Sequence, residues 1–334
     1  MKGAVLGILI TLTSLASGAV RVLQTNSAGD NIHVIDPATN QVVATIEDIE
    51  APHGIVIAPD GTRIYVTDEA LRTLDVVDAR TLKVLKRIPL SGRPNNVDVA
   101  KDGTRVYVGI RQAPGVVDVI DTASLTNVKS IPVKGEIHNV YVTPDGRYAV
   151  AGSIAASTIN VIDTSTATVS WTLTMSAGIR PMAFTRNPDG STKDIIVQLS
   201  GFHGFAVVDF AARKEIRRIT LPDLPEHAKE TEGLQGSPSH GLAITPDGRM
   251  LWATSKYYDC VVAYSLPDYK FLKMIPVGLH PDWLTITPDG KGLYVAVAGD
   301  DVTVVVDIQT MKVVKKIPVG PVPKRNASGM LRTD

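Results

Sequence analysis

Three histidines recur at one position relative to a turn motif. His53, His138 and His240 each lie seven residues before the Asp of a Pro-Asp-Gly sequence. Imidazole is the commonest protein ligand of transition metals, and it also transfers protons near neutral pH. The repeated spacing predicts that the three side chains meet at one level of a repeating fold. There they would hold a divalent transition metal, zinc or copper. Structural histidines that bond to neighbouring loop carbonyls and ordered water are the alternative.

Other polar residues share this position or are expected beside it. Asn95 and Asp282 also precede a turn Asp by seven residues. Acid–base roles are predicted for three residues near the metal: Asp282, His280 and His203. Ligand binding is predicted for a second set: Arg93, Arg180, Asn95, Tyr257 and His227. The two arginines each precede a proline, where a guanidinium can hold a carboxylate. Pairing with neighbouring acidic loops is the alternative for both.

A repeat of β-strands must position these side chains. Seven apolar segments, most of them ending in Asp, recur along the chain, with their last residues at 36, 78, 121, 163, 209, 265 and 307. Six Asp-Gly turns lie between other β-rich segments, and the Asp and Gly of such turns suit tight hairpins. One unit is predicted to contain the strands 53–58, 63–67, 73–78 and 83–88.

Four short strands in each repeat of 40–45 residues are typical of a β-propeller. The fold predicted is all-β, with seven blades of four antiparallel strands. The sequence contains six Asp-Gly turns but seven predicted blades. The regular pattern therefore lacks the innermost strand of one blade. We expect residues 323–331 to supply it and to close the ring with the strand that begins at Val20.

The motifs resemble those of a known repeat family. The segment Ile64-Tyr-Val-Thr-Asp68, the Pro-Asp-Gly turns and the Val-Ile-Asp segments are similar to the YVTN family of β-propeller repeats. The resemblance covers nearly all of the chain after residue 19. It implies the propeller fold but no single activity, because such propellers include surface-layer proteins, periplasmic binders, haem-carrying domains and metal-dependent lyases or hydrolases.

The N-terminus predicts export. Lys2 precedes a short apolar segment and then small residues at 17–19, which is the order of a secretory signal. Residues 1–19 are therefore assigned to a signal peptide and residues 20–334 to the propeller, in the periplasm or outside the cell. A buried first strand is the alternative. The apolar segment is too short to span a membrane.

Charge and cysteine content exclude several classes of function. Lys and Arg number 34, as do Asp and Glu, so the balance offers no basic surface for nucleic acid. The single cysteine, Cys260, rules out an internal disulfide and lies in an apolar segment that predicts an inert buried thiol.

The predicted site lies on what we call the upper face. This face comprises the loops that precede the innermost strands and the loops between second and third strands. The connection 220–239 is long for a loop and leads into His240, so we expect it to form a lid. Two functions remain open. One is a metal-dependent lyase, hydrolase or oxidoreductase acting on a small anionic molecule. The other is a non-catalytic scaffold that binds a ligand or a partner protein on the upper face.

Overall fold

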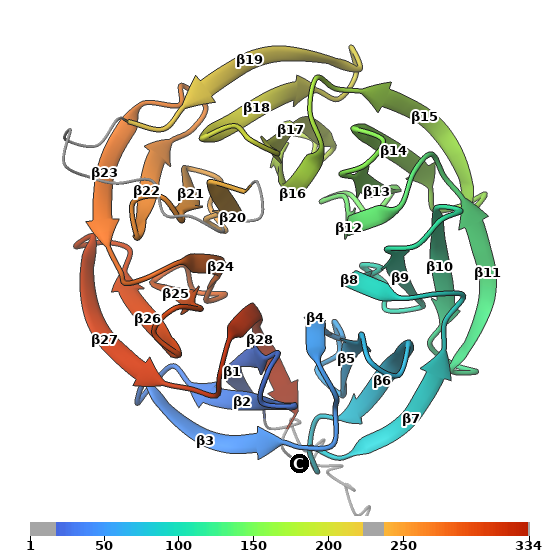
Figure 1. Ribbon diagram of the computed structural model, residues 1–334, viewed down its shortest axis with the longest axis horizontal. Helices are drawn as coiled ribbons and strands as arrows, with labels where there is room; N and C mark the ends of the chain where they lie inside the picture. Colours follow the sequence, from blue (N-terminus) through green and yellow to red (C-terminus); the bar gives the residue numbers. More distant parts are fainter. Residues whose placement is uncertain (1–17, 223–236, 333–334) are drawn as a thin grey trace, which may run out of the picture.

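The computed structural model describes residues 18–222 and 237–332. All regular secondary structure in these residues is β-strand, arranged as seven sheets of four antiparallel strands. The sheets surround one axis as the blades of a propeller (Figure 1). The predicted all-β, seven-bladed fold is confirmed. No helix in the described part of the chain is long and apolar enough to cross a membrane.

We number the blades 1 to 7 in chain order, and blade 7 combines the two ends of the chain. The innermost strands are β4 (Pro52–Ile57), β8 (Pro94–Val99), β12 (Ile137–Val142), β16 (Ile179–Arg186), β20 (Ser239–Ile244), β24 (Pro281–Ile286) and β28 (Pro323–Arg332). The second strands are β5 (Arg63–Asp68), β9 (Arg105–Ile110), β13 (Tyr148–Ser153), β17 (Thr192–Leu199), β21 (Met250–Ser255), β25 (Gly292–Val297) and β1 (Gly18–Asn26).

The third and fourth strands complete each blade toward the outside of the ring. The third strands are β6 (Thr73–Asp78), β10 (Val116–Asp121), β14 (Thr158–Asp163), β18 (Gly204–Asp209), β22 (Cys260–Ser265), β26 (Val302–Asp307) and β2 (Asn31–Asp36). The outer strands are β7 (Val84–Pro89), β11 (Thr126–Pro132), β15 (Thr168–Thr174), β19 (Lys214–Thr220), β23 (Phe271–Pro276), β27 (Lys312–Pro318) and β3 (Gln41–Ile46). In blade 1 each strand starts within one residue of its predicted position.

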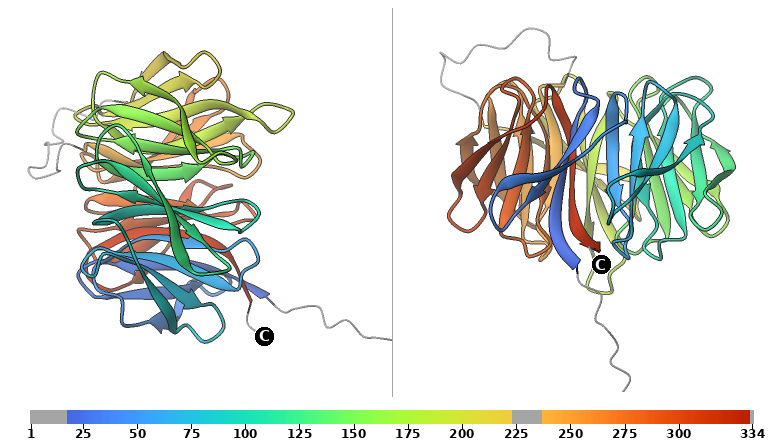
Figure 2. Two further views of the ribbon diagram at one scale, coloured as in Figure 1. Left: turned by 90° about the vertical axis from the view of Figure 1, so that its right-hand side faces the viewer. Right: turned by 90° about the horizontal axis from the view of Figure 1, so that it is seen from below.

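The C-terminal strand closes the ring. β28 pairs antiparallel with β1, in a register that runs from Gly18 opposite Arg332 to Asn26 opposite Pro323. The two strands lie side by side in blade 7 (Figure 2). This confirms that the C-terminal segment supplies the missing innermost strand. The predicted signal, residues 1–19, lies outside the described residues except for Gly18 and Ala19, which form the start of β1.

The core consists of layers between neighbouring blades. Large aromatic side chains on second strands pack against the next blade: Tyr65 joins the apolar cluster of blade 2, and Trp252 joins that of blade 6. Cys260 is only 1% exposed, and burial raises the pKa of its thiol to about 12. A thiol with so high a pKa is unreactive at neutral pH, as expected from its apolar surroundings.

Every innermost strand has an irregular register with its neighbour near its first residues. The shift lies between Pro52 and Ile55 in blade 1, and equivalent shifts occur in the other six blades. A β-bulge turns side chains away from the regular alternation of a strand. Because the shifts occur at the upper ends of the strands, they determine which side chains face the channel there.

Glycine permits close approach at two of these bulges. Gly54 follows His53, and a Cβ at Gly54 would lie 2.7 Å from the carbonyl oxygen of Asn95 in blade 2. Gly241 follows His240, and a Cβ there would lie 3.0 Å from the Cα of Trp283 in blade 6. The backbone of each His-Gly pair therefore lies directly against the innermost strand of the next blade.

Candidate functional site

A cavity of about 650 Å³ opens at the upper end of the central channel. We call it the channel pocket. The structure places His53, His138 and His240 together in its wall, on the alternate blades 1, 3 and 5. The complete described lining is Ser27, Ala51, His53, Glu69, Arg93, Arg111, His138, Ile154, Arg180, Ser237, His240, Lys256, Asp282, Lys324 and Arg325.

Positive charge dominates this lining. It contains six Lys and Arg side chains but only two carboxylates, Glu69 and Asp282. Both carboxylates are already paired: Glu69 contacts Arg93, and Asp282 contacts Lys256 and lies 3.8 Å from the Nζ of Lys324. The pocket therefore has an excess of cationic groups, which favours an anionic ligand.

His240 is held as a proton acceptor. Its Nδ1 lies 2.9 Å from the backbone carbonyl oxygen of Asp282, and only an N–H at Nδ1 can donate to that oxygen. The carboxylate of Asp282 lies 3.7 Å from the same nitrogen. The proton of the neutral ring is thus on Nδ1, and the lone pair of Nε2 remains for other partners.

His138 is held in the opposite tautomer. The side-chain oxygen of Asn139 accepts a hydrogen bond of 3.0 Å from Nη2 of Arg325, which directs the Asn139 amide nitrogen toward Nδ1 of His138 at 2.6 Å. An amide N–H donates, so Nδ1 of His138 accepts, and the ring proton lies on Nε2. The two rings are 6.3 Å apart between centroids and nearly perpendicular. The channel pocket thus contains one imidazole acceptor and one imidazole donor.

All three histidines are neutral at neutral pH. Burial lowers the pKa of His53, His138 and His240 well below the ordinary 6.5, and the positive charge of Arg325 lowers each of them further. Burial alone would raise the pKa of Asp282, but the positive charges of Lys256 and Lys324 hold it well below 3.8. Asp282 is therefore ionised and positions His240 instead of carrying a transferable proton.

Acid is expected to destabilise the fold through these three histidines. Below about pH 6.5 the unfolded chain binds protons at these rings that the folded chain does not, so stability falls with pH by roughly 1.4 kcal/mol per unit for each histidine. Asp75 and Asp98 oppose this below about pH 6, because burial raises the pKa of each to about 6.

The measurement is denaturant unfolding at pH 7.5 and 5.5 for the wild type and for a His53→Asn, His138→Asn, His240→Asn triple variant. The wild type should lose more stability than the variant over this interval, by at most about 4 kcal/mol. Equal losses in the two proteins would show that the three rings are accessible to protons in the folded state.

The donor set fits a divalent cation poorly. Among the described residues no three His, Cys, Asp or Glu side chains are grouped so as to hold a metal ion. A metal at Nε2 of His138 would also need the proton of this ring on Nδ1, where it would oppose the Asn139 amide donor. The zinc or copper site predicted from His53, His138 and His240 stays a prediction.

The predicted ligand-binding residues separate in the structure. Arg180 lines the pocket, donates from Nε to Ser200 at 2.9 Å, and has its pKa lowered by burial and by the like charge of Arg111. Arg93 lines the pocket in an ion pair with Glu69. Asn95 is not among the described lining residues, because its amide donates to Glu69 at 3.3 Å behind the wall.

Two predicted catalytic residues are engaged elsewhere on the upper face. His203 bonds Ser255 at 2.8 Å and packs against Tyr257 and Tyr258, so neither His203 nor Tyr257 is among the described lining residues. The loop of His280 is fixed by a backbone N–H bond of 2.8 Å to Asp259, and its side chain is not part of the lining either. His227 and most of the predicted lid at 220–239 lie outside the described residues.

Lys324 and Arg325 belong to the site but were missed in the sequence. Both lie on the closing strand, which no Asp-Gly turn follows, so the spacing rule had no reference point there. A usable signal existed: Pro323 precedes Lys324 as Pro52 precedes His53 and Pro281 precedes Asp282. In blade 4 the residue seven positions before the turn Asp is Met182, which is buried in the core, because the irregular register between Ile179 and Met182 turns Arg180 toward the pocket instead.

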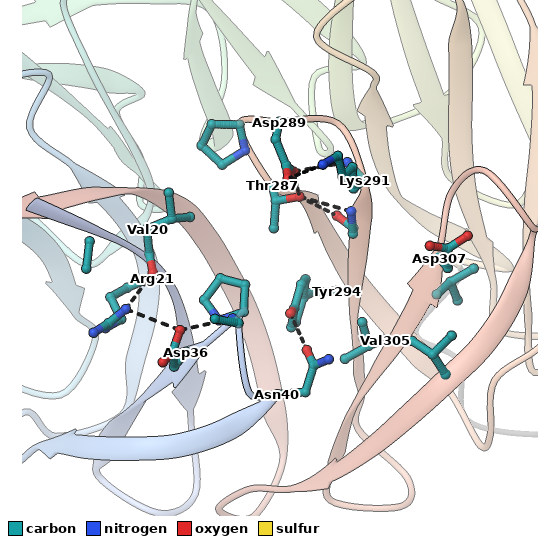
Figure 3. Close-up of a pocket in the computed structure, with 17 residues that line it drawn as sticks. Val20, Arg21, Asp36, Asn40, Thr287, Asp289, Lys291, Tyr294, Val305 and Asp307 are labelled. Atoms are coloured by element: carbon teal, nitrogen blue, oxygen red, sulfur yellow. Dashed lines mark hydrogen bonds and ion pairs between the residues drawn. The ribbon is translucent and has the colours of Figure 1, made fainter.

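A second cavity, of about 660 Å³, lies between blades 6 and 7 on the opposite face (Figure 3). Its polar side chains form hydrogen bonds and ion pairs with neighbouring strands and turns. Arg21 lies 3.3 Å from Asp36, Tyr294 donates to Asn40 across the blade boundary, and Asp289 accepts from its own turn. The bond between Tyr294 and Asn40 joins blade 6 to blade 7, so we assign this groove to the packing of the blades.

Solved propellers of several activities share this architecture. The chain is similar to a hydrazine synthase structure from Kuenenia stuttgartiensis, with 20% identity over 91% of this chain and 99% of that one and a TM-score of 0.75. It is also similar to the periplasmic gluconolactonase PpgL of Pseudomonas aeruginosa, with 18% identity over 95% and 100% and a TM-score of 0.75. The dihydro-heme d1 dehydrogenase NirN in complex with DHE matches with 17% identity over 92% and 74% and a TM-score of 0.64.

These likenesses support the fold class, a β-propeller, and a shared fold does not determine the activity. No family model matches the chain, and a search of curated proteins finds no match. Membership of the YVTN family therefore stays a prediction that rests on the repeat motifs.

Proposed function

We propose that this protein is an exported hydrolase that opens a lactone or ester bearing an acidic group. The observation that carries the proposal is the composition of the channel pocket: six cationic side chains surround two neutral imidazoles held in opposite tautomers. The cations select an anionic substrate, and the imidazoles supply one proton acceptor and one proton donor.

The reaction would proceed by attack of water on the carbonyl carbon. Nε2 of His240 accepts the proton of the attacking water while the new C–O bond forms. The N–H of His138 and the surrounding cations stabilise the negative charge on the carbonyl oxygen. The acyl C–O bond then breaks, and the leaving oxygen takes the proton from His240. The product is a hydroxy acid, whose carboxylate suits the same positive lining.

Two further points support this reading. A propeller of similar fold is a periplasmic gluconolactonase, so lactone chemistry is compatible with the architecture. The order of residues at the N-terminus is that of a secretory signal, which supports a location in the periplasm or outside the cell.

Acidic sugars should bind to the pocket, whereas neutral ones should not. The experiment is calorimetric titration of the protein with gluconate, 6-phosphogluconate and glucose at two salt concentrations. Both acids should bind, 6-phosphogluconate more tightly, with affinity that falls as salt screens the cations. Arg111→Gln should weaken binding about tenfold, because it removes one charge-assisted hydrogen bond. Lys315→Gln, an exposed cation of the outer strand β27, is the matched control.

Zinc and copper are titrated in parallel, because the predicted metal site is the second candidate for this pocket. Nδ1 of His53 has no hydrogen-bond partner among the described residues, so this ring is the most available of the three for binding a metal. If a metal binds and raises the melting temperature while no acid binds, the metal site replaces the anion pocket. If neither binds, a scaffold that docks a partner protein on the upper face becomes the better interpretation.

A further inference from the structure

Arg325 is a buried cation whose hydrogen-bonding capacity is largely unused. Its side chain extends from β28 in blade 7 and is only 2% exposed. The guanidinium carbon lies 3.6 Å from the ring centroid of Trp283 in blade 6, and Nη2 reaches Asn139 in blade 3, across the ring (Figure 1). Nε and Nη1 have no hydrogen-bond partner among the described residues, while Tyr141 also interacts with the guanidinium: burial lowers the pKa of Arg325 and Tyr141 raises it.

Such an arrangement is costly unless a ligand completes it. A buried N–H without a partner loses its hydrogen bonds to water without replacement, and the cost is larger when the group is charged. Asp282, the buried acid of the pocket, is already held by Lys256 and Lys324. Arg325 lines a pocket whose other cations also attract anions, and two of its own donors have no hydrogen-bond partner among the described residues. A carboxylate or phosphate oxygen is the acceptor that would satisfy them.

We propose that Arg325 determines substrate specificity by holding the acidic group of the ligand at the floor of the channel pocket. The proposal rests on the proposed function of the pocket as an anion site and adds the residue that anchors the anion. It also links binding to closure of the ring. Arg325 and Lys324 both lie on β28, so an anion held by them and by other blades keeps the closing strand in place.

The first test uses Arg325→Gln, with Arg332→Gln as the matched control on the same strand. Arg332 is exposed at the end of β28. Arg325→Gln should weaken 6-phosphogluconate binding at least about tenfold, whereas Arg332→Gln should leave it unchanged. The ligand-free Arg325→Gln protein should melt at the same temperature as the wild type or above it, because an incompletely bonded buried charge is removed. Arg325→Lys should bind with intermediate affinity, because it keeps the charge but loses the planar donor set.

The second test needs no variant and stands if Arg325→Gln fails to fold. Hydrogen exchange of the β28 amides is measured in the wild type with and without 6-phosphogluconate. If closure and binding are linked, a probe concentration of 100 times its Kd should slow exchange through ring opening about 100-fold.

The outcomes separate the two proposals. If no acid binds to the wild type, the proposed function fails and this inference fails with it. If acids bind equally well to the wild type and to Arg325→Gln, Arg325 is not the anchor, although the anion pocket stands. Unchanged exchange of β28 in the presence of saturating probe would overturn the link to ring closure.

Discussion

Deletion of residues 321–334 should abolish cooperative folding. The deletion removes β28, which pairs with β1 along its whole length and places Leu331 in the apolar core between blades 7 and 1. Without it, β1 becomes an unpaired innermost edge, and the ring has a gap between β24 and β4. The exposed backbone and apolar surface together should exceed the total stability of a typical domain, about 5–15 kcal/mol.

Thermal unfolding followed by circular dichroism measures this effect. The shortened protein should show a broad transition or should aggregate. A synthetic peptide of residues 321–334, added in trans, should restore a sharp transition, and a scrambled peptide of the same composition should not. A shortened protein that melts sharply within a few degrees of the full chain would mean that six blades and an incomplete seventh are stable without closure.

His240→Asn should remove lactone hydrolysis while preserving ligand binding. The amide nitrogen of asparagine can replace Nδ1 as donor to the carbonyl oxygen of Asp282, but asparagine lacks the acceptor at Nε2. Loss of a general base typically costs 10²- to 10⁴-fold in rate, and we expect a loss of at least about 100-fold. The affinity for gluconate should change less than about threefold.

The measurement is hydrolysis of glucono-lactone and its 6-phosphate with a pH-stat, corrected for the spontaneous reaction. His33→Asn, on the third strand β2, is the control and should retain full activity. The wild-type rate should remain constant as pH falls through 6.5, because the pKa of His240 is well below that value in the folded protein. Full activity of His240→Asn would remove His240 from the mechanism and leave only the binding function.

The sequence predicted the fold because the information is local and repeated. Turn chemistry at each Asp-Gly sequence and the spacing of the Val-Ile-Asp segments determine where strands begin and end. The Asp that ends such a segment caps the next turn: Asp78 accepts from the backbone N–H groups of Arg80 and Thr81. Seven copies of one pattern reinforce each other, so an error in one blade does not change the prediction for the ring.

The site was only partly predictable, because its chemistry depends on contacts between blades. Spacing alone brought His53, His138 and His240 together. It did not show that the Asp282 carbonyl would bind one ring and the Asn139 amide another, and these partners fix the tautomers. Nor did the spacing show that Arg325 would cross the channel. The cationic character of the pocket became visible only when loops from six other blades were placed around Arg325.

In each innermost strand, the bulge separates the side chains that pack in the core from the side chains that can contact a ligand. Below the bulge, alternating side chains belong to the core between blades. At the bulge, side chains of several blades line the pocket: histidine in three blades, arginine in blade 4, aspartate in blade 6, and lysine and arginine in blade 7. A change at one such position alters one sector of the wall and leaves the neighbouring cores intact. A protein that evolves by blade duplication can therefore change its ligand specificity by substitutions at the bulge of one blade at a time.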